Sequence, residues 1–509
     1  MQPTTSKEAT VSVQQCFIGI DVGLTSAKAA AFDADGNELR SYSAPNPRVA
    51  VASDRQEIDM AALWGVVADV LGHLTGWLDA HGWAVQSIGA TGHGNGLYLV
   101  DEALAPVRSA FASTDTRSEN IVAGLDEAEV ERVRAITGSM PWAGQPGVLL
   151  RWLHDNEPEA LERARWALTC KDWITACLVG RATADYSDAS GCGLVNLAER
   201  RYEPEVFDVL GVPRELMRLQ PPLANSDAVV GAVTGEAAAR TGLAAGIPVV
   251  AGCMDCVASP IGAGATKRGD VTVIVGTWAI NSVVVPVKDA PPRVTLNALL
   301  PDPKLMLAQE VAPTSAASIE WYSSLMSTLA ADGVTPQQLL AAAESVPPGA
   351  DGLIFLPFVH GAPEHLGASG TLIGVKGSHG HREIARAVAE GITQYHRVQL
   401  AKLRSSGAEV SDEPWTLAGG GAKNPLWAQM FADVIDHPVR RQLGTELGAR
   451  GVALLAATGT GHDTGGWGVS PDPALVVSPG RDRDSYQLQG ERFDRVLAAM
   501  GQVWTEAAR

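Results

Sequence analysis

Apolar and polar positions near the start of the chain predict a β-hairpin followed by a helix. An apolar run over 17–20 ends at Asp21, a Gly-containing turn covers 22–26, and a second apolar run follows over 28–32. The stretch DADGN at 33–37 supplies Asp and Gly, which adopt the backbone angles of tight turns. After Asp59 the apolar residues recur every three or four positions, which predicts a helix over 60–82 with Asp59 as its N-cap.

Similar patterns along the rest of the chain predict an α/β protein. The expected elements are a strand–turn–strand at 85–101, helices near 118–135 and 147–165, a strand over 246–255 that ends at Asp255, a strand–turn–strand at 268–285, a long helix at 381–404, a strand, Gly-rich loop and helix at 415–435, and a small-residue helix at 446–461. The hairpin at 268–285 resembles the first one, because both reach Gly and Thr directly after an apolar run. Two such hairpins half a chain apart suggest two related α/β domains.

Composition and charge narrow the class of protein. The chain has 509 residues, of which 46% are hydrophobic and 19% charged, as in ordinary folded proteins. The net charge of −18 argues against nucleic acid or an anionic membrane as the partner, since both favour basic surfaces. The first residues are polar, without the apolar core of a signal peptide, and no run approaches the roughly 18–20 apolar residues of a membrane span. We therefore expect a cytoplasmic protein.

The pair Cys253-x-x-Cys256 admits three interpretations: a redox motif, half of a zinc site, or a frame around Asp255. A structural zinc site needs four ligands, no second CxxC exists, and the close pair His379 and His381 lies in a Gly-rich stretch expected to be an exposed loop. A thioredoxin-like motif should open a helix, whereas this pair closes an apolar run. The pattern favours the frame around Asp255, and the other four cysteines are expected to be small core residues.

Three Gly-rich turns follow apolar strands, at 21–26, 276–277 and 419–424. Such turns direct backbone N–H groups at anions, and neighbouring hydroxyls add donors. Each turn alone is equally compatible with a simple chain reversal, but three of them favour a nucleotide. Asp21, beside the first turn, is a natural partner for Mg²⁺, reached through water. Asp255, at a strand end, is placed to accept the proton of an attacking hydroxyl.

Five segments, in order, resemble the FGGY family of carbohydrate kinases: GIDVGLTSAKAAAFD, GCMDCVASPIGAGATKRGD, VGTWAINSV, GTLIGVKGSHGHREIARAVAEGI and GGGAKNPLWAQMFADV. The resemblance implies two ribonuclease-H-like domains of the actin/hexokinase type, here 1–257 and 258–509, with ATP and sugar in the cleft between them. It also implies that Asp255 is the general base and that Asp21 orients Mg²⁺. The implied ATP-binding residues are Gly23, Thr25, Ser26, Lys28, Gly276, Thr277, Gly420, Gly421 and Asn424. Cys253 and Cys256 are then expected to pack around Asp255 and to raise its pKa by excluding water.

The expected sugar side of the cleft includes the segment ATGHGNGLYLVD, in which Gly94-Asn95 replaces the Arg-Glu pair of glycerol kinases. The sequence is most similar to L-xylulose kinases, and it shares the Gly-rich form of 92–96 with erythritol kinases. The candidate sugar-binding residues are His93, Gly94, Asn95, Asp115, Trp142, Gln145 and Asp255. For His93 a structural histidine, and for Trp142 a loop anchor, are equally compatible interpretations.

The expected reaction is ATP-dependent phosphorylation of a primary hydroxyl of a ketopentose such as L-xylulose. A kinase for a four- or five-carbon polyol is the alternative, and a non-catalytic nucleotide-dependent clamp or sensor is more distant. The expected partner is a small sugar or polyol, with no nucleic acid and no membrane. A homodimer is left open.

Overall fold

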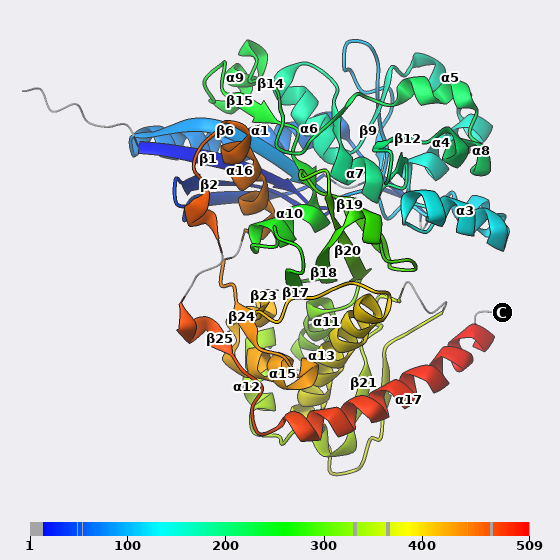
Figure 1. Ribbon diagram of the computed structural model, residues 1–509, viewed down its shortest axis with the longest axis vertical. Coiled ribbons are helices and arrows are strands. Elements are labelled where there is room, and N and C mark those ends of the chain that lie inside the picture. The colour runs from blue at the N-terminus through cyan, green and yellow to red at the C-terminus, as the bar shows by residue number, and fades with distance from the viewer. Residues whose placement is uncertain are drawn as a thin grey trace, which may run out of the picture.

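Two seven-stranded sheets organise the molecule (Figure 1). The computed structural model describes residues 14–47, 49–52, 54–328, 333–362, 367–444, 446–468 and 472–507. The first sheet has the strand order β14-β15-β6-β1-β2-β3, with β16 also paired to β6, and the second has the order β19-β20-β18-β17-β23-β24-β25. The first sheet lies in the upper part of Figure 1, and the second extends from the centre towards the lower left.

The elements before residue 263 build the first sheet and its surroundings. Its strands are β1 (Gln14–Val22), β2 (Ser26–Asp33), β3 (Glu38–Pro45), β6 (Trp83–Gly92), β14 (Val229–Ala232), β15 (Pro248–Val250) and β16 (Cys253–Met254). The shorter strands are β4 (Val49–Ala52), β5 (Arg55–Ile58), β7 (Tyr98–Val100), β8 (Ala110–Phe111), β9 (Trp166–Leu168), β10 (Ala184–Asp185), β11 (Val195–Asn196), β12 (Arg201–Tyr202) and β13 (Leu223–Ala224). The helices are α1 (Met60–Ala80), α2 (Glu119–Ala123), α3 (Glu127–Thr137), α4 (Pro146–Asn156), α5 (Pro158–Arg163), α6 (Cys170–Val179), α7 (Tyr186–Gly191), α8 (Pro204–Val209), α9 (Gly235–Thr241) and α10 (Asp255–Gly262).

The later elements build the second sheet. Its strands are β17 (Val271–Val275), β18 (Ala279–Pro286), β19 (Leu296–Leu299), β20 (Leu305–Ala312), β23 (Trp415–Gly419), β24 (Val439–Arg441) and β25 (Val476–Val477), beside the separate pair β21 (Ile354–Leu356) and β22 (Thr371–Ile373). The helices are α11 (Ala316–Ser327), α12 (Pro336–Ala343), α13 (His381–Ser405), α14 (Gly420–Lys423), α15 (Pro425–Ile435), α16 (Leu447–Gly459) and α17 (Arg483–Ala507). Both predicted hairpins are present as antiparallel pairs, β1 with β2 and β17 with β18.

Helix α1 forms because its apolar residues can be buried on one side against the first sheet. The Asp59 carboxylate accepts a hydrogen bond of 3.0 Å from the Ala62 N–H, which confirms the predicted N-cap. Leu71 and Leu74 are fully buried, and α1 packs on β2 and β3. By length and composition α1 alone, among the described helices, could cross a membrane, but core helices of this kind pass the same test.

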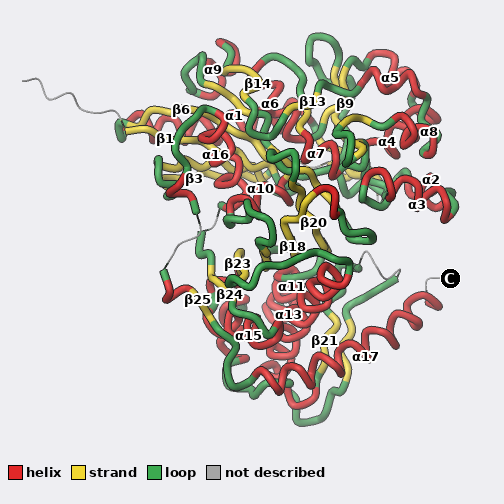
Figure 2. The backbone as a smooth tube through the Cα atoms, viewed as in Figure 1, coloured by secondary structure: helices red, strands yellow, loops and turns green. Residues whose placement is uncertain are grey.

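Helix α16 covers the other face of the first sheet although it lies late in the chain (Figure 2). Glycines allow this close approach: a Cβ at Gly19 of β1 would lie 1.8 Å from the Ala449 carbonyl oxygen, and one at Gly451 would lie 2.0 Å from the Ala258 carbonyl oxygen of α10. The predicted small-residue helix is therefore confirmed, and it packs on strands and a helix from the first half of the chain. The domain division at 257/258 stays a prediction.

Two local expectations are wrong. The predicted strand over 246–255 is two short strands, because Gly252 adopts a φ of 73° and a Cβ there would lie 1.8 Å from the Ala90 carbonyl oxygen. Asp255 therefore opens helix α10 rather than ending a strand. The predicted Gly-rich loop after β23 is mostly the helical turn α14, which begins after Gly419 at a φ of 84°.

Candidate active site

The carboxyl ends of three parallel strands bring the predicted catalytic residues together. Residue 92 at the end of β6 pairs with Val22 of β1 on one side and with Met254 of β16 on the other. Asp21 and Asp255 consequently flank the end of β6, two strand spacings or about 10 Å apart along the sheet. The turn over 92–95 lies between them, because His93 continues directly from β6 and its N–H bonds to the Val22 carbonyl at 2.9 Å.

Asp255 carries a half-buried carboxylate without a cationic partner among the described residues. Its Oδ1 accepts a hydrogen bond of 2.7 Å from the Cys256 N–H, and the nearby Gly94 N–H also favours the charged form, so both N–H groups lower its pKa. Burial raises the pKa of Asp255 to about 7, and the nearby negative charge of Asp21 raises it further against these hydrogen bonds. A carboxyl group with this pKa changes protonation near neutral pH, as a general base requires.

Asp21 lies in a similar environment at the end of β1. Burial raises its pKa to about 6, the Lys28 ammonium lowers it, and Glu446 raises it. Lys28 is itself paired with Glu446 at 3.2 Å. A Cβ at Gly448, in the first turn of α16, would lie 2.4 Å from Asp21 Oδ2, so glycine is what lets this helix start beside the carboxylate.

The cysteines beside Asp255 are buried free thiols. Because α10 begins between them, the sequence-based reason for rejecting a redox motif is wrong. Burial itself now argues against redox chemistry, since it raises the pKa of both thiols well above the usual value. Within the described ranges no three His, Cys, Asp or Glu side chains converge as metal ligands.

His379, expected in an exposed loop, bonds through its ring nitrogens to Asp351 and to the Lys376 N–H.

The first predicted phosphate turn, at 21–26, leaves a hydroxyl exposed. Gly23 N–H donates to the Ser26 carbonyl at 3.0 Å, and Asn46 braces the turn by bonding to the carbonyls of Gly23 and Thr25. The Thr25 side chain therefore lies at the surface, while Ser26 is half-buried.

The second predicted phosphate turn, at 276–277, and the predicted adenosine-side turn, at 419–424, follow the C-terminal ends of two neighbouring strands of the second sheet. Strands β17 and β23 are parallel, with Val275 opposite Gly419. A Cβ at Gly421 would lie 2.7 Å from the Val275 side chain. Gly276 accepts a hydrogen bond of 2.8 Å from the Ala316 N–H at the start of α11. Gly420 and Thr277 are exposed at these strand ends. Asn424 caps α15, because its side-chain oxygen accepts a hydrogen bond of 3.0 Å from the Trp427 N–H.

Asn95 and its neighbours form the predicted sugar turn. Asn95 adopts a φ of 63° and is buried, and its side-chain oxygen has no hydrogen-bond partner among the described residues. A Cβ at Gly94 would lie 1.7 Å from the end of the Met254 side chain, so a larger residue here would have to displace that side chain next to Asp255. His93 Nε2 bonds to the Tyr98 hydroxyl at 3.0 Å.

Asp115 is fully buried and already has partners. Arg117 holds it with two hydrogen bonds of 2.8 Å, one to each carboxylate oxygen, and the Gln56 N–H adds a third of 2.8 Å. Gln145 is also used within the fold, because its side chain bonds to the Met140 carbonyl and to the Trp142 N–H. The Trp142 side chain is exposed. Sugar-binding roles for these residues stay predictions.

A buried charge cluster behind β16 escaped the sequence analysis. Lys171 is fully buried, pairs with Asp172 and Asp185, and lies 3.9 Å from Asp188. Burial raises the pKa of Asp188 to about 7. The signal was a Lys-Asp pair inside an otherwise apolar helix. Two further ion partners were missed in the same way: Arg117, two residues after Asp115, and Glu446, the partner of Lys28.

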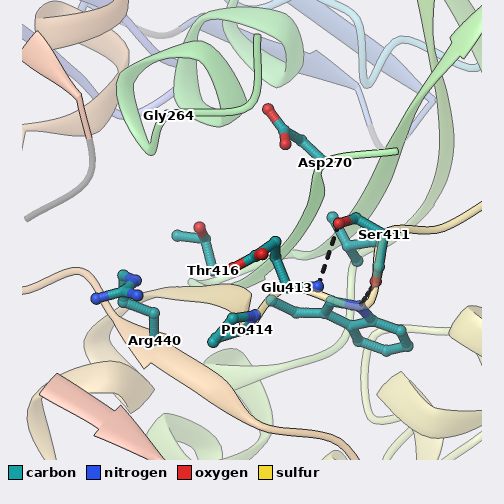
Figure 3. A pocket seen from close by; sticks show the side chains of 9 residues that line it. Gly264, Asp270, Ser411, Glu413, Pro414, Thr416 and Arg440 are labelled. Carbon is teal, nitrogen blue, oxygen red and sulfur yellow. Dashed lines mark hydrogen bonds between the residues drawn. The ribbon is translucent and has the colours of Figure 1, made fainter. Parts of the chain in front are cut away.

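A separate cavity of about 160 Å³ lies at the other end of these strands, where β17 and β23 begin (Figure 3). Asp270, Glu413 and Arg440 are among its lining residues, and the Ser411 carbonyl accepts a hydrogen bond of 3.2 Å from the Trp415 indole N–H. None of the predicted site residues lines it.

Comparisons with known proteins agree with this geometry. The chain matches the N-terminal domain of the FGGY family of carbohydrate kinases over residues 16–262 and the C-terminal domain over 271–460. It is 29% identical to the L-xylulose/3-keto-L-gulonate kinase of Escherichia coli K12, over 96% of this chain and 97% of that protein. The erythritol kinase of Brucella abortus is 27% identical over 87% of each chain. The solved xylulose kinase of Rhodospirillum rubrum shares 28% identity and a TM-score of 0.83, covering 96% of this chain and 100% of that one. The predicted two-domain α/β fold class is thereby confirmed.

Proposed function

The chain belongs to the FGGY family of carbohydrate kinases, and from that membership we propose that its acceptor is a ketopentose such as L-xylulose, phosphorylated on a primary hydroxyl. It is a phosphotransferase for small sugars, and the family implies ATP as the donor. The names of several relatives, L-xylulose and xylulose kinases at 26–29% identity, support a pentulose.

The observation that carries the catalytic proposal is the environment of Asp255. Its carboxylate lies beside the sugar turn, has only backbone N–H donors among the described residues, and has a pKa raised to about 7 by burial. The sugar hydroxyl loses its proton to Asp255 as its oxygen bonds to the γ-phosphorus, and the bond from that phosphorus to the bridging oxygen of ADP breaks. The N–H groups of the turns at 23–26 and 276–277 are placed to face the phosphate oxygens.

Asp21 fits a role towards Mg²⁺. Its carboxylate has a raised pKa and no bonded cation among the described residues, since Lys28 is paired with Glu446. No cage of three ligands is present in the described part of the chain, which suits an ion held largely by water and nucleotide oxygens. When bound, Mg²⁺ would neutralise developing charge on the phosphates.

Release of ADP from ATP, measured against a panel of pentuloses, tetritols and pentitols, tests the substrate proposal. We expect the highest kcat/KM with a ketopentose. A clear preference for erythritol or a pentitol would transfer the assignment to polyols, which the small residue Gly94 and the erythritol kinase relative favour as the second candidate. ADP release that does not depend on any added acceptor would contradict both.

A further inference from the structure

The helix that begins at Asp255 lacks one of its own hydrogen bonds. In an α-helix each carbonyl accepts from the N–H four residues later. The Cys256 carbonyl would need the N–H of residue 260, but Pro260 has none. The carbonyl directly after the proposed base is therefore left without a donor from its own helix. A buried carbonyl without a partner is costly.

Gln309, in the second sheet, supplies the missing hydrogen-bond donor. Its side-chain Nε2 lies 2.7 Å from the Cys256 carbonyl oxygen and 2.7 Å from Ser282 Oγ. Gln309 belongs to β20, and its side chain is fully buried. Its oxygen Oε1 has no hydrogen-bond partner among the described residues. An apolar side chain of similar volume would avoid the free-energy cost of burying this unpaired oxygen. What the amide adds over such a side chain is therefore its pair of N–H donors.

Cys256 connects this hydrogen bond to the carboxylate of Asp255. Its N–H donates to Asp255 Oδ1 at 2.7 Å, while its carbonyl accepts from Gln309. One residue is thus held by the base on one side and by the second sheet on the other. We propose that Gln309 is a positioning residue: it replaces the hydrogen bond that Pro260 removes and fixes the first turn of α10, and with it Asp255, against the half of the molecule that carries the second phosphate turn. This inference rests on the proposed role of Asp255 as base.

The interplay of Pro260 and Gln309 gives a test by rescue. Gln309→Met removes the donor with little change in volume, and we expect kcat to fall roughly five- to fiftyfold at saturating ATP and sugar, with KM for ATP changed less than twofold. Pro260→Ala restores a backbone N–H to the helix and should by itself stay within about twofold of the wild type. The double variant should recover most of the lost kcat, because the backbone N–H restored at position 260 can now bond to the Cys256 carbonyl.

Gln394→Met is the matched control. Gln394 is also fully buried, and its amide donates to the Tyr486 carbonyl at 3.2 Å, away from α10. Its variant should lose no more than about twofold in kcat, and Pro260→Ala should not improve it. If Gln309→Met does not yield folded protein, Gln309→Leu takes its place in the same comparison.

The proposal is overturned if the Gln309 variant keeps its kcat, or if the double variant is no faster than the Gln309 variant. Asp255→Asn is measured alongside. Wild-type-like activity of Asp255→Asn would remove the proposed base, whereas failure of the rescue with an inactive Asp255→Asn would remove only the role of Gln309. The two failures are therefore distinguishable.

Discussion

Asp255 and Asp115 were both predicted for the same cleft, yet the fold treats the two carboxylates differently. Asp115 is fully buried, the Arg117 guanidinium neutralises its charge, and the Gln56 N–H donates a further hydrogen bond. Asp255 remains half-buried, its only hydrogen-bond donors among the described residues are backbone N–H groups, and burial raises its pKa to about 7. A buried carboxylate with a bonded guanidinium holds chain segments together, whereas one without a cation is ready to take up a proton near neutral pH.

The largest expected effect is on turnover. Asp255→Asn keeps the side-chain volume and its hydrogen bond from Cys256 but cannot accept a proton. We expect kcat to fall about 10²–10⁴-fold, the usual contribution of a positioned base, while ATP binding measured by calorimetry is retained. A variant that keeps most of its kcat would show that another group takes the proton.

Asp115→Ala should instead act mainly on stability. It leaves the Arg117 guanidinium buried with Glu57 as its remaining acidic partner. Removing one member of a buried ion pair costs about 3–5 kcal/mol, and we expect urea unfolding midpoints to fall accordingly. Where the variant still folds, a fall in kcat/KM for the sugar without a change in KM for ATP would support the additional sugar-binding role. Unchanged stability would contradict the purely structural interpretation of the Arg117 pair.

Asp255→Asn should also make the ligand-free protein more stable at alkaline pH. A carboxyl group whose pKa is raised by folding stabilises the folded state fully below its unfolded pKa of 3.8, and this contribution is lost as pH rises through about 7. The stability of Asp255→Asn relative to the wild type should therefore increase by on the order of 2 kcal/mol between pH 5 and pH 8. Equal unfolding curves of the two proteins at every pH would show that folding does not perturb Asp255.

The smallest effect is expected from the two thiols. Cys253→Ala with Cys256→Ala should leave kcat within about tenfold of the wild type, since neither thiol ionises near neutral pH. Elemental analysis of the purified wild type should find no stoichiometric zinc. One zinc per chain would revive the metal interpretation of the CxxC pair.

The contrast between the two aspartates also shows what the sequence could predict. Turn residues and apolar spacing were sufficient for the hairpins at Asp21 and at Gly276, and for the helix capped by Asp59, because these depend on local chemistry. The start of α10 at Asp255 was missed because it depends on Gly252, which lets the chain pass close to the Ala90 carbonyl, and Ala90 is distant in sequence.

The partners of buried polar groups were harder to predict. Lys171 reaches Asp185, and Gln309 reaches Cys256, across separations that no local pattern records. The family resemblance implied a role for Asp255 as the base, but it could not show that Arg117 is already hydrogen-bonded to Asp115.

The pH dependence of kcat/KM for the sugar tests the central claim most directly. At saturating ATP this parameter reports the enzyme before it binds the sugar, so it should fall about tenfold per pH unit below the pKa of Asp255, near 7, as Asp255 becomes protonated. Because ATP also titrates in this range, Asp255→Asn is measured at each pH under saturating ATP and Mg²⁺, and the ratio of wild type to variant is followed. We predict that this ratio is large above pH 7 and shrinks progressively as the pH is lowered to 5. A ratio that stays constant from pH 5 to pH 8 would contradict the assignment of Asp255 as the base.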